Sequence, residues 1–130
     1  MHLPTETDTL ALGASLAREI GPGDIIGLRG DLGTGKTTLV RGLLRALGYS
    51  EEVRSPTFTL VQEYDTDPPV CHVDLYRLTN EKEVIDLGLR DYMSGHALLI
   101  EWIERAGELI TPTKLVELRF AATGREAVLT

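Results

Sequence analysis

A glycine-rich segment at residues 30–37 constrains this chain more than any other part of the sequence. It reads Gly-Asp-Leu-Gly-Thr-Gly-Lys-Thr and matches the pattern G-x-x-x-x-G-K-[ST] at every specified position. The glycines permit positive φ angles and let consecutive backbone N–H groups face a bound anion. Lys36 supplies a positive charge for β- and γ-phosphates, and the hydroxyl of Thr37 is a ligand for Mg²⁺. The motif therefore predicts a binding site for a nucleoside triphosphate.

The residues on either side of this motif support that interpretation. Residues 25–28 are apolar and predict a buried strand that leads into the loop, while the residues after the loop carry apolar side chains at helical spacing up to Gly48. A strand, a loop and a helix in this order aim the helix N-terminus at bound phosphate. We therefore expect the nucleotide to be bound by the loop and the first helical turn, that is, by Asp31, Leu32, Gly33, Thr34, Gly35, Lys36, Thr37 and Thr38.

The rest of the chain predicts a single α/β domain over residues 1–130, of the P-loop NTPase kind, with a mixed central sheet flanked by helices. The sheet is expected to be mixed because parallel strands next to the loop would lie beside a hairpin. We expect helices at 9–20, 81–87 and 104–110, hairpin strands at 58–64 and 70–75, a central strand at 97–100, and closing strands at 115–120 and 127–129.

Composition and charge limit where in the cell this protein is expected and which partners it is expected to bind. No run approaches the ~20 apolar residues of a membrane span, and the start has no basic stretch followed by an apolar one, so we expect a cytoplasmic protein without a membrane partner. A net charge of −7 argues against strong, independent binding to nucleic acid. The single cysteine, Cys71, excludes an internal disulfide and is expected to be a small core residue.

Two carboxylates are candidates for magnesium binding and hydrolysis. Asp74 follows the apolar run at 70–73, which His72 interrupts, and Glu101 follows the uninterrupted run at 97–100. Acids at the C-terminal ends of strands lie near a phosphate loop in folds of this kind. Either acid is a candidate to contact the metal, usually through water, while the other orients or deprotonates the attacking water. Each also has the alternative role of capping a turn.

Three further residues leave two interpretations each. Thr57, after Pro56, is either a sensor of the γ-phosphate and its Mg²⁺ or part of a turn. Trp102 is either a core aromatic or a contact for the nucleotide. His72 is expected to pack in or beside the sheet rather than to act in catalysis. The Asn-Lys-x-Asp motif that reads guanine is missing from the sequence, so adenine, and hence ATP, is favoured by elimination.

Five segments together resemble a known family. The segments at 30–38, 55–60, 72–78, 86–92 and 99–102 occur in the order and spacing of TsaE, the bacterial ATPase family needed for threonylcarbamoyladenosine modification of tRNA. The resemblance covers almost the whole chain. It implies a small mixed α/β ATPase that uses Mg²⁺, hydrolyses ATP to ADP and works with two partners, TsaD and TsaB. TsaD transfers the threonylcarbamoyl group to the adenosine beside the anticodon, so tRNA would be reached only through the complex.

The resemblance also implies roles for individual residues. Lys36 and Thr37 keep their phosphate and metal roles, Asp74 looks like the Walker B acid, and Glu101 looks like a second carboxylate near the metal. The segment that contains Thr57 looks like a switch loop, and Trp102 looks like a residue close to the nucleotide. Residues 5–9 match the family's N-terminal segment that approaches adenine. Ile103 departs from the pattern, because many relatives have proline there.

Two other functions are compatible with a phosphate loop. A small-molecule kinase would need an acceptor-binding insertion and an arginine-bearing lid, and no segment of this chain is long enough for either. A nucleotide-responsive binding module with little turnover is the second alternative. The acids Asp74 and Glu101 argue against complete inactivity but are compatible with slow hydrolysis.

Overall fold

The computed structural model describes residues 1–53, 56 and 60–130. Thr57, the expected switch residue, lies outside the described residues, as do the first two residues of the expected hairpin strand at 58–64.

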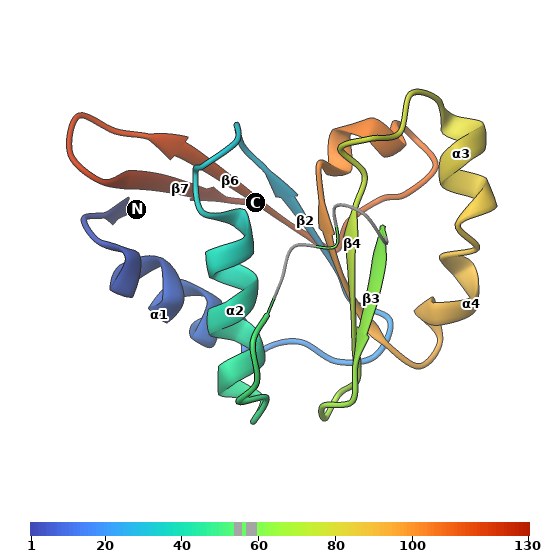
Figure 1. The fold of residues 1–130 in the computed structure, drawn as a ribbon, viewed down its shortest axis with the longest axis horizontal. Helices are drawn as coiled ribbons and strands as arrows, with labels where there is room; N and C mark the ends of the chain where they lie inside the picture. Colours follow the sequence, from blue (N-terminus) through green and yellow to red (C-terminus); the bar gives the residue numbers. More distant parts are fainter. Residues whose placement is uncertain (54–55, 57–59) are drawn as a thin grey trace.

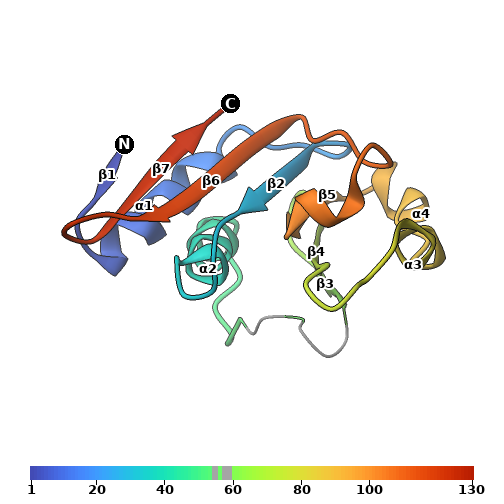
Figure 2. The ribbon, with the colours of Figure 1, turned by 90° about the horizontal axis from the view of Figure 1, so that it is seen from above.

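The centre of the described structure is a seven-stranded sheet in the order β1-β7-β6-β2-β5-β4-β3 (Figure 2). The inner strands β6, β2, β5 and β4 run parallel to one another, while β3, β7 and β1 are antiparallel to their neighbours. The expected mixed sheet is therefore confirmed. The strands are β1 (His2–Leu3), β2 (Ile25–Arg29), β3 (Val61–Tyr64), β4 (Val70–Asp74), β5 (Ala97–Glu101), β6 (Lys114–Phe120) and β7 (Arg125–Leu129).

Helices cover both faces of this sheet, in two groups that lie apart in Figure 1. The helices α1 (Glu6–Ala17) and α2 (Lys36–Ala46) share one apolar core with one set of alternating strand residues. The shorter elements α3 (Glu81–Asp86), α4 (Arg90–Met93) and the 3₁₀ helix η1 (Ile103–Ala106) lie on the other core with the opposite set. Because side chains alternate across a strand, each inner strand contributes to both cores.

Helices α1 and α2 pack closely because each has a glycine at the contact. A side-chain carbon at Gly13 would collide with the backbone carbonyl of Leu39, and one at Gly42 with the carbonyl of Leu10. Both glycines are buried, so nothing larger than hydrogen fits at either position without moving a helix axis. Helix α2, which begins at Lys36, is thus held directly against α1.

Strand β5 is the central strand that the sequence predicts. It ends at Glu101, beside Asp74 at the end of β4. All five of its residues are buried, and it lies between β2 and β4. In the register of these parallel strands, Glu101 pairs with Leu28 on one side and with Asp74 on the other. The ends of β2, β5 and β4 therefore meet at one edge of the sheet, where the loop after β2 begins.

The differences from the predicted elements are local and have physical causes. Helix α1 begins at Glu6 rather than at residue 9, because the Asp8 carboxylate accepts hydrogen bonds from the backbone N–H and the hydroxyl of Thr5. The helix expected at 104–110 is instead the short η1, which follows Trp102 in a left-handed conformation. The sequence patterns missed β1 and α4, which have only two and four residues. Within the described residues, no helix is both long and apolar enough to span a bilayer.

Candidate functional site

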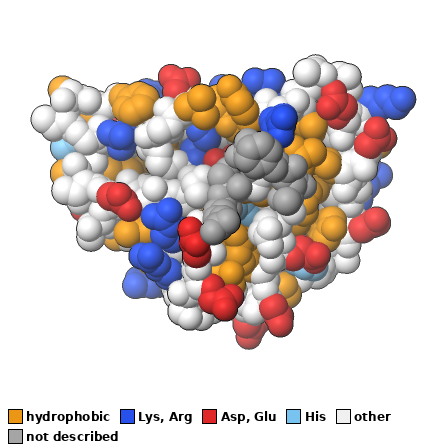
Figure 3. All heavy atoms as spheres, in the orientation of Figure 1, with side chains coloured by type: hydrophobic (Ala, Val, Ile, Leu, Met, Phe, Trp, Pro, Cys, Tyr) orange, Lys and Arg blue, Asp and Glu red, His pale blue; other side chains and the backbone are white. Residues whose placement is uncertain are grey.

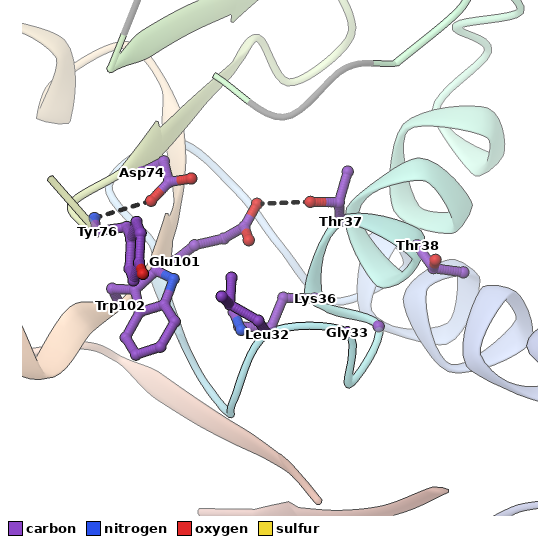
Figure 4. Close-up of a pocket in the computed structure, with 10 residues that line it drawn as sticks. Leu32, Gly33, Lys36, Thr37, Thr38, Asp74, Tyr76, Glu101 and Trp102 are labelled. Carbon is purple, nitrogen blue, oxygen red and sulfur yellow. Dashed lines mark hydrogen bonds between the residues drawn. The ribbon is translucent and has the colours of Figure 1, made fainter. Parts of the chain in front are cut away.

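A cavity of about 410 Å³ lies at the edge of the sheet where β2, β4 and β5 end (Figure 4). Its walls come from the loop before α2, the start of α2, and the residues at and just after the ends of β4 and β5. The lining residues are Leu32, Gly33, Gly35, Lys36, Thr37, Thr38, Asp74, Tyr76, Glu101 and Trp102. The structure thus gathers in one cavity most of the residues that the sequence predicts for the site.

The loop presents the N-terminus of α2 to this cavity. Gly35 is the N-cap residue of the helix and has φ of 108°, a left-handed conformation that suits glycine. Because glycine has no side chain, no side-chain oxygen caps the start of the helix. No acidic residue lies in the first turn of α2. The buried hydroxyl of Thr34 donates to the carbonyl of Asp31 at 2.7 Å, so this side chain shapes the loop. The partial positive charge of the helix end is therefore available to an anion.

Lys36 is buried against the same loop. Its ammonium group donates to the carbonyl of Gly30 and, at 3.0 Å, to that of Asp31, and it lies 4.6 Å from the centroid of the Trp102 ring. Burial lowers the pKa of Lys36 below its usual value, and the negative charge of Glu101 is the strongest influence in the opposite direction. A phosphate group in the cavity would give this ammonium a negatively charged partner in place of neutral carbonyls.

Glu101 is the acid in contact with the loop helix. Its Oε2 accepts a hydrogen bond from Oγ1 of Thr37 at 3.1 Å and lies 2.6 Å from Nε2 of His72 (Figure 4 shows the bond to Thr37). Only 3% of Glu101 is exposed. Asp74 is buried as well, and its Oδ1 accepts from the backbone N–H of Tyr76 at 2.9 Å. The two acids and the Thr37 hydroxyl thus place several oxygen atoms of the kind that bind metal ions at one edge of the cavity.

Trp102 lines the cavity and also packs against the core that contains α3, α4 and η1. Its backbone has φ of 59°, and its N–H donates to the carbonyl of Leu28 at 3.0 Å, which ties the turn after β5 to β2. The half-buried ring packs against Tyr76 with centroids 4.9 Å apart, next to the Lys36 ammonium. Ile103 is the first residue of η1. The Trp102 ring is therefore well placed to contact a bound nucleotide.

A second cavity of about 240 Å³ lies beside the first and shares Gly33, Gly35 and Thr38 with it. Its other walls are the N-terminal segment before and within α1 and the turn between β6 and β7, namely Leu3, Pro4, Thr5, Glu6, Thr9, Thr34, Gly124 and Arg125. Arg125 donates to the carbonyl of Gly33 at 3.1 Å, and its guanidinium lies 4.6 Å from the centroid of Phe120. The N-terminal stretch at 5–9 therefore adjoins the phosphate loop.

Sequence reasoning missed three residues of this region. Arg125 lies in no motif that would have singled it out, and Tyr76 lies in the recognised segment at 72–78 but was given no role there. His72 was expected to pack in the sheet, and it does so with no exposed surface, but its contact with Glu101 was not foreseen. The signal for His72 was available, because a polar residue interrupts an otherwise apolar strand.

The fold and the site together define an α/β protein of the phosphate-loop class. Comparison with known sequences narrows this class. A family model described as "Threonylcarbamoyl adenosine biosynthesis protein TsaE" matches residues 3–127, and the chain belongs to this family. The expected resemblance is thereby confirmed.

Individual relatives and a solved structure agree with this assignment. The "tRNA threonylcarbamoyladenosine biosynthesis protein TsaE" of Bacillus subtilis is 43% identical over 115 residues, which is 86% of this chain and 70% of that protein. The protein of the same description from Rickettsia conorii is 39% identical over 125 residues, 94% of this chain and 71% of the relative. The crystal structure of Bacillus subtilis YdiB superposes with a TM-score of 0.80 at 29% identity, covering 99% of this chain and 81% of that one.

Proposed function

We propose that this chain is an ATPase that binds ATP with Mg²⁺ at the phosphate loop, hydrolyses ATP to ADP, and thereby supports threonylcarbamoylation of the tRNA adenosine beside the anticodon. The observation that carries the ATPase part of the proposal is the 3.1 Å contact between the Thr37 hydroxyl and the Glu101 carboxylate, while membership of the TsaE family supports the role in tRNA modification. The contact joins the expected metal ligand of the loop to an acid of the neighbouring strand, in the cavity that also contains Lys36. ATP hydrolysis needs these three groups close together.

Phosphate binding would use the start of α2 and Lys36. The β- and γ-phosphates would lie against the first N–H groups of the helix, where the helix dipole favours negative charge. Lys36 would exchange the carbonyls of Gly30 and Asp31 for phosphate oxygens. Residues 31–38 would thus form the phosphate-binding part of the site.

Magnesium would be held by Thr37 and by one of the acids Asp74 and Glu101. Among the described residues there is no group of three or more His, Cys, Asp or Glu side chains able to hold a metal by themselves. Mg²⁺ is commonly bound through one or two protein oxygens together with substrate phosphates and water. When bound, the ion neutralises charge that develops on the transferred phosphoryl group. The contact with Thr37 favours Glu101 as the acid at the metal and leaves Asp74 to orient the attacking water.

The nucleoside would occupy the region around the second cavity or the Trp102 ring. The second cavity adjoins the loop and is lined by the N-terminal segment that includes Thr5 and Thr9. The missing guanine-reading motif favours adenine. On this basis the substrate is ATP rather than GTP, with Thr57 as a further candidate to sense the γ-phosphate.

The proposed partners are TsaD and TsaB, with tRNA reached only through their complex in the cytoplasm. The net charge of −7 opposes independent binding to a polyanion. Among the described side chains of the face in Figure 3, basic and acidic groups are interspersed, so this face offers no continuous basic surface. We therefore expect this chain alone not to retain tRNA at physiological salt.

Reconstitution tests the proposal. Phosphate release from ATP is measured for the chain alone and with TsaD, TsaB and tRNA. Threonylcarbamoylation of tRNA is followed in parallel, with a threonylcarbamoyl donor supplied in every reaction and with either ATP or a non-hydrolysable analogue. We expect slow release by the chain alone, faster release in the complex, and continued modification only with ATP. Transfer of phosphate to a small acceptor would instead indicate the kinase alternative. Nucleotide-dependent association with the partners without hydrolysis would indicate a binding module.

A further inference from the structure

His72 is a fully buried polar residue next to the candidate site. It lies on β4 two residues before Asp74, and its exposed fraction is 0%. Strand residues two positions apart face the same side of a sheet, so His72 faces the same helices, α1 and α2, as Asp74. Burying an imidazole is unfavourable unless its polar atoms are hydrogen-bonded. Packing alone therefore gives no reason for a histidine at this position.

One ring nitrogen of His72 contacts the acid that faces the phosphate loop. Nε2 lies 2.6 Å from Oε2 of Glu101, the same oxygen that accepts the Thr37 hydroxyl. An ionised carboxylate only accepts hydrogen bonds, so the bond requires a proton on Nε2. The other nitrogen, Nδ1, is buried and has no hydrogen-bond partner among the described residues. With a single proton on Nε2, the carboxylate receives its hydrogen bond, and the unpartnered Nδ1 is a buried acceptor rather than a buried N–H.

We propose that His72 is a positioning residue, whose Nε2–H holds the Glu101 carboxylate in place beside Thr37. A glutamate side chain has several rotatable bonds, and donors from β4 and α2 on one oxygen restrict them. The carboxylate is then already oriented when the nucleotide arrives, which is the usual role of hydrogen-bond partners behind a metal or catalytic ligand. The role in catalysis rests on the proposed function, whereas the contact between His72 and Glu101 does not.

Two amide substitutions of His72 test whether a hydrogen-bond donor must stand at the position of Nε2 to contact Glu101. In His72→Gln the amide nitrogen can extend to the place of Nε2, whereas in His72→Asn the shorter amide ends near the place of Nδ1. We expect His72→Asn to lower kcat for ATP hydrolysis by about 10–100-fold, with KM for ATP changed less than about threefold. His72→Gln should restore most of the lost rate. Equal losses in both variants would overturn the proposal.

A double-mutant cycle separates positioning from general damage to the fold. In a Glu101→Gln background the carboxylate is gone, so His72→Asn should cause little further loss of rate. Val70→Thr is the matched control, since it adds a buried polar group on the same strand and the same face, away from the cavity. This control should lower the melting temperature without lowering kcat. Additive losses from His72→Asn and Glu101→Gln would contradict the proposal.

Two further measurements do not depend on turnover. Nitrogen-15 spectra of the histidine rings in the nucleotide-free protein should show the proton of His72 on Nε2, and a proton on Nδ1 alone would overturn the inference. The gain in ADP affinity on adding Mg²⁺ should fall in His72→Asn and recover in His72→Gln. If wild-type protein with its partners hydrolyses no ATP, the proposed function fails. The ring spectrum and the Mg²⁺ dependence of ADP binding would still decide the inference about His72.

Discussion

Asp74 and Glu101 are paired in register at the ends of two neighbouring parallel strands, and both carboxylates are buried. Glu101 lies on β5, next to the strand that carries the phosphate loop, and Asp74 lies one strand farther away. Their positions in the sheet therefore differ with respect to a nucleotide on the loop. This arrangement is the basis for assigning different roles to two acids, either of which the strand patterns left as a candidate to contact the metal.

Replacement of Lys36 by alanine is expected to weaken ATP binding by tenfold or more. The substitution removes a charge-assisted hydrogen bond to phosphate, which contributes about 1.5–3 kcal/mol. Isothermal titration calorimetry with Mg·ATP and Mg·ADP measures the change. Lys82→Ala, at an exposed position on α3, is the matched control and should bind as wild type does. Unchanged affinity in Lys36→Ala would contradict the site assignment.

Glu101→Gln is expected to separate binding from turnover. The amide keeps the shape of the side chain but loses the negative charge, so ADP affinity measured without Mg²⁺ should change less than threefold while kcat falls by about 100-fold or more. Single-turnover hydrolysis and calorimetry together provide the two values. Glu108→Gln, an exposed acid after η1, should leave both unchanged. A normal hydrolysis rate in Glu101→Gln would reassign this acid to a structural role.

Trp102 is the only tryptophan of the chain, so its fluorescence reports on the cavity without labelling. Because its ring lies 4.6 Å from the Lys36 ammonium, movement of this ammonium onto phosphate should change the emission. We expect a saturable change on titration with Mg·ADP, which is absent in Lys36→Ala. A constant emission, together with binding heat in calorimetry, would place the nucleotide away from this ring.

The start of α1 should depend on pH through Asp8. Hydrogen bonds from the Thr5 hydroxyl and N–H lower the pKa of Asp8 below its usual 3.8. Because the folded pKa is depressed, this carboxylate stabilises the fold above pH 3.8 and the contribution is lost as pH falls through the folded pKa. Thermal melts should therefore show Asp8→Asn less stable than wild type at neutral pH, with the difference shrinking in acid. A difference that does not vary with pH would exclude the ionic contribution.

Much of the architecture was predictable because its signals are local. The unbroken apolar run at 97–100 indicated a strand buried on both faces, and β5 is central in the sheet. The loop at 30–37 could be recognised because its glycines and Lys36 stand close together in the sequence and are all needed for one purpose, the binding of phosphate. By contrast, the contact of Thr37 with Glu101 joins residues 64 positions apart, and the contact of His72 with Glu101 spans 29 positions. Only the order of the strands brings such pairs together.

The smaller elements were harder to predict for a different reason. The start of α1 depends on the bonds between Thr5 and Asp8, which precede the first apolar residue of the helical pattern. The turn at Trp102 adopts a left-handed backbone that tryptophan rarely takes by itself, so tertiary packing decides it. Apolar periodicity contains no information about either feature.

The paired glycines between α1 and α2 limit how this protein can be engineered for heat resistance. Replacing a glycine inside a helix by alanine ordinarily stabilises a protein by up to about 1 kcal/mol, so Gly13 and Gly42 would be natural choices in such a project. Here an added methyl group would meet a carbonyl of the opposite helix, and the substitution would have the reverse sign. Because one of the displaced helices begins at Lys36, a change intended only to raise the melting temperature would also alter nucleotide affinity.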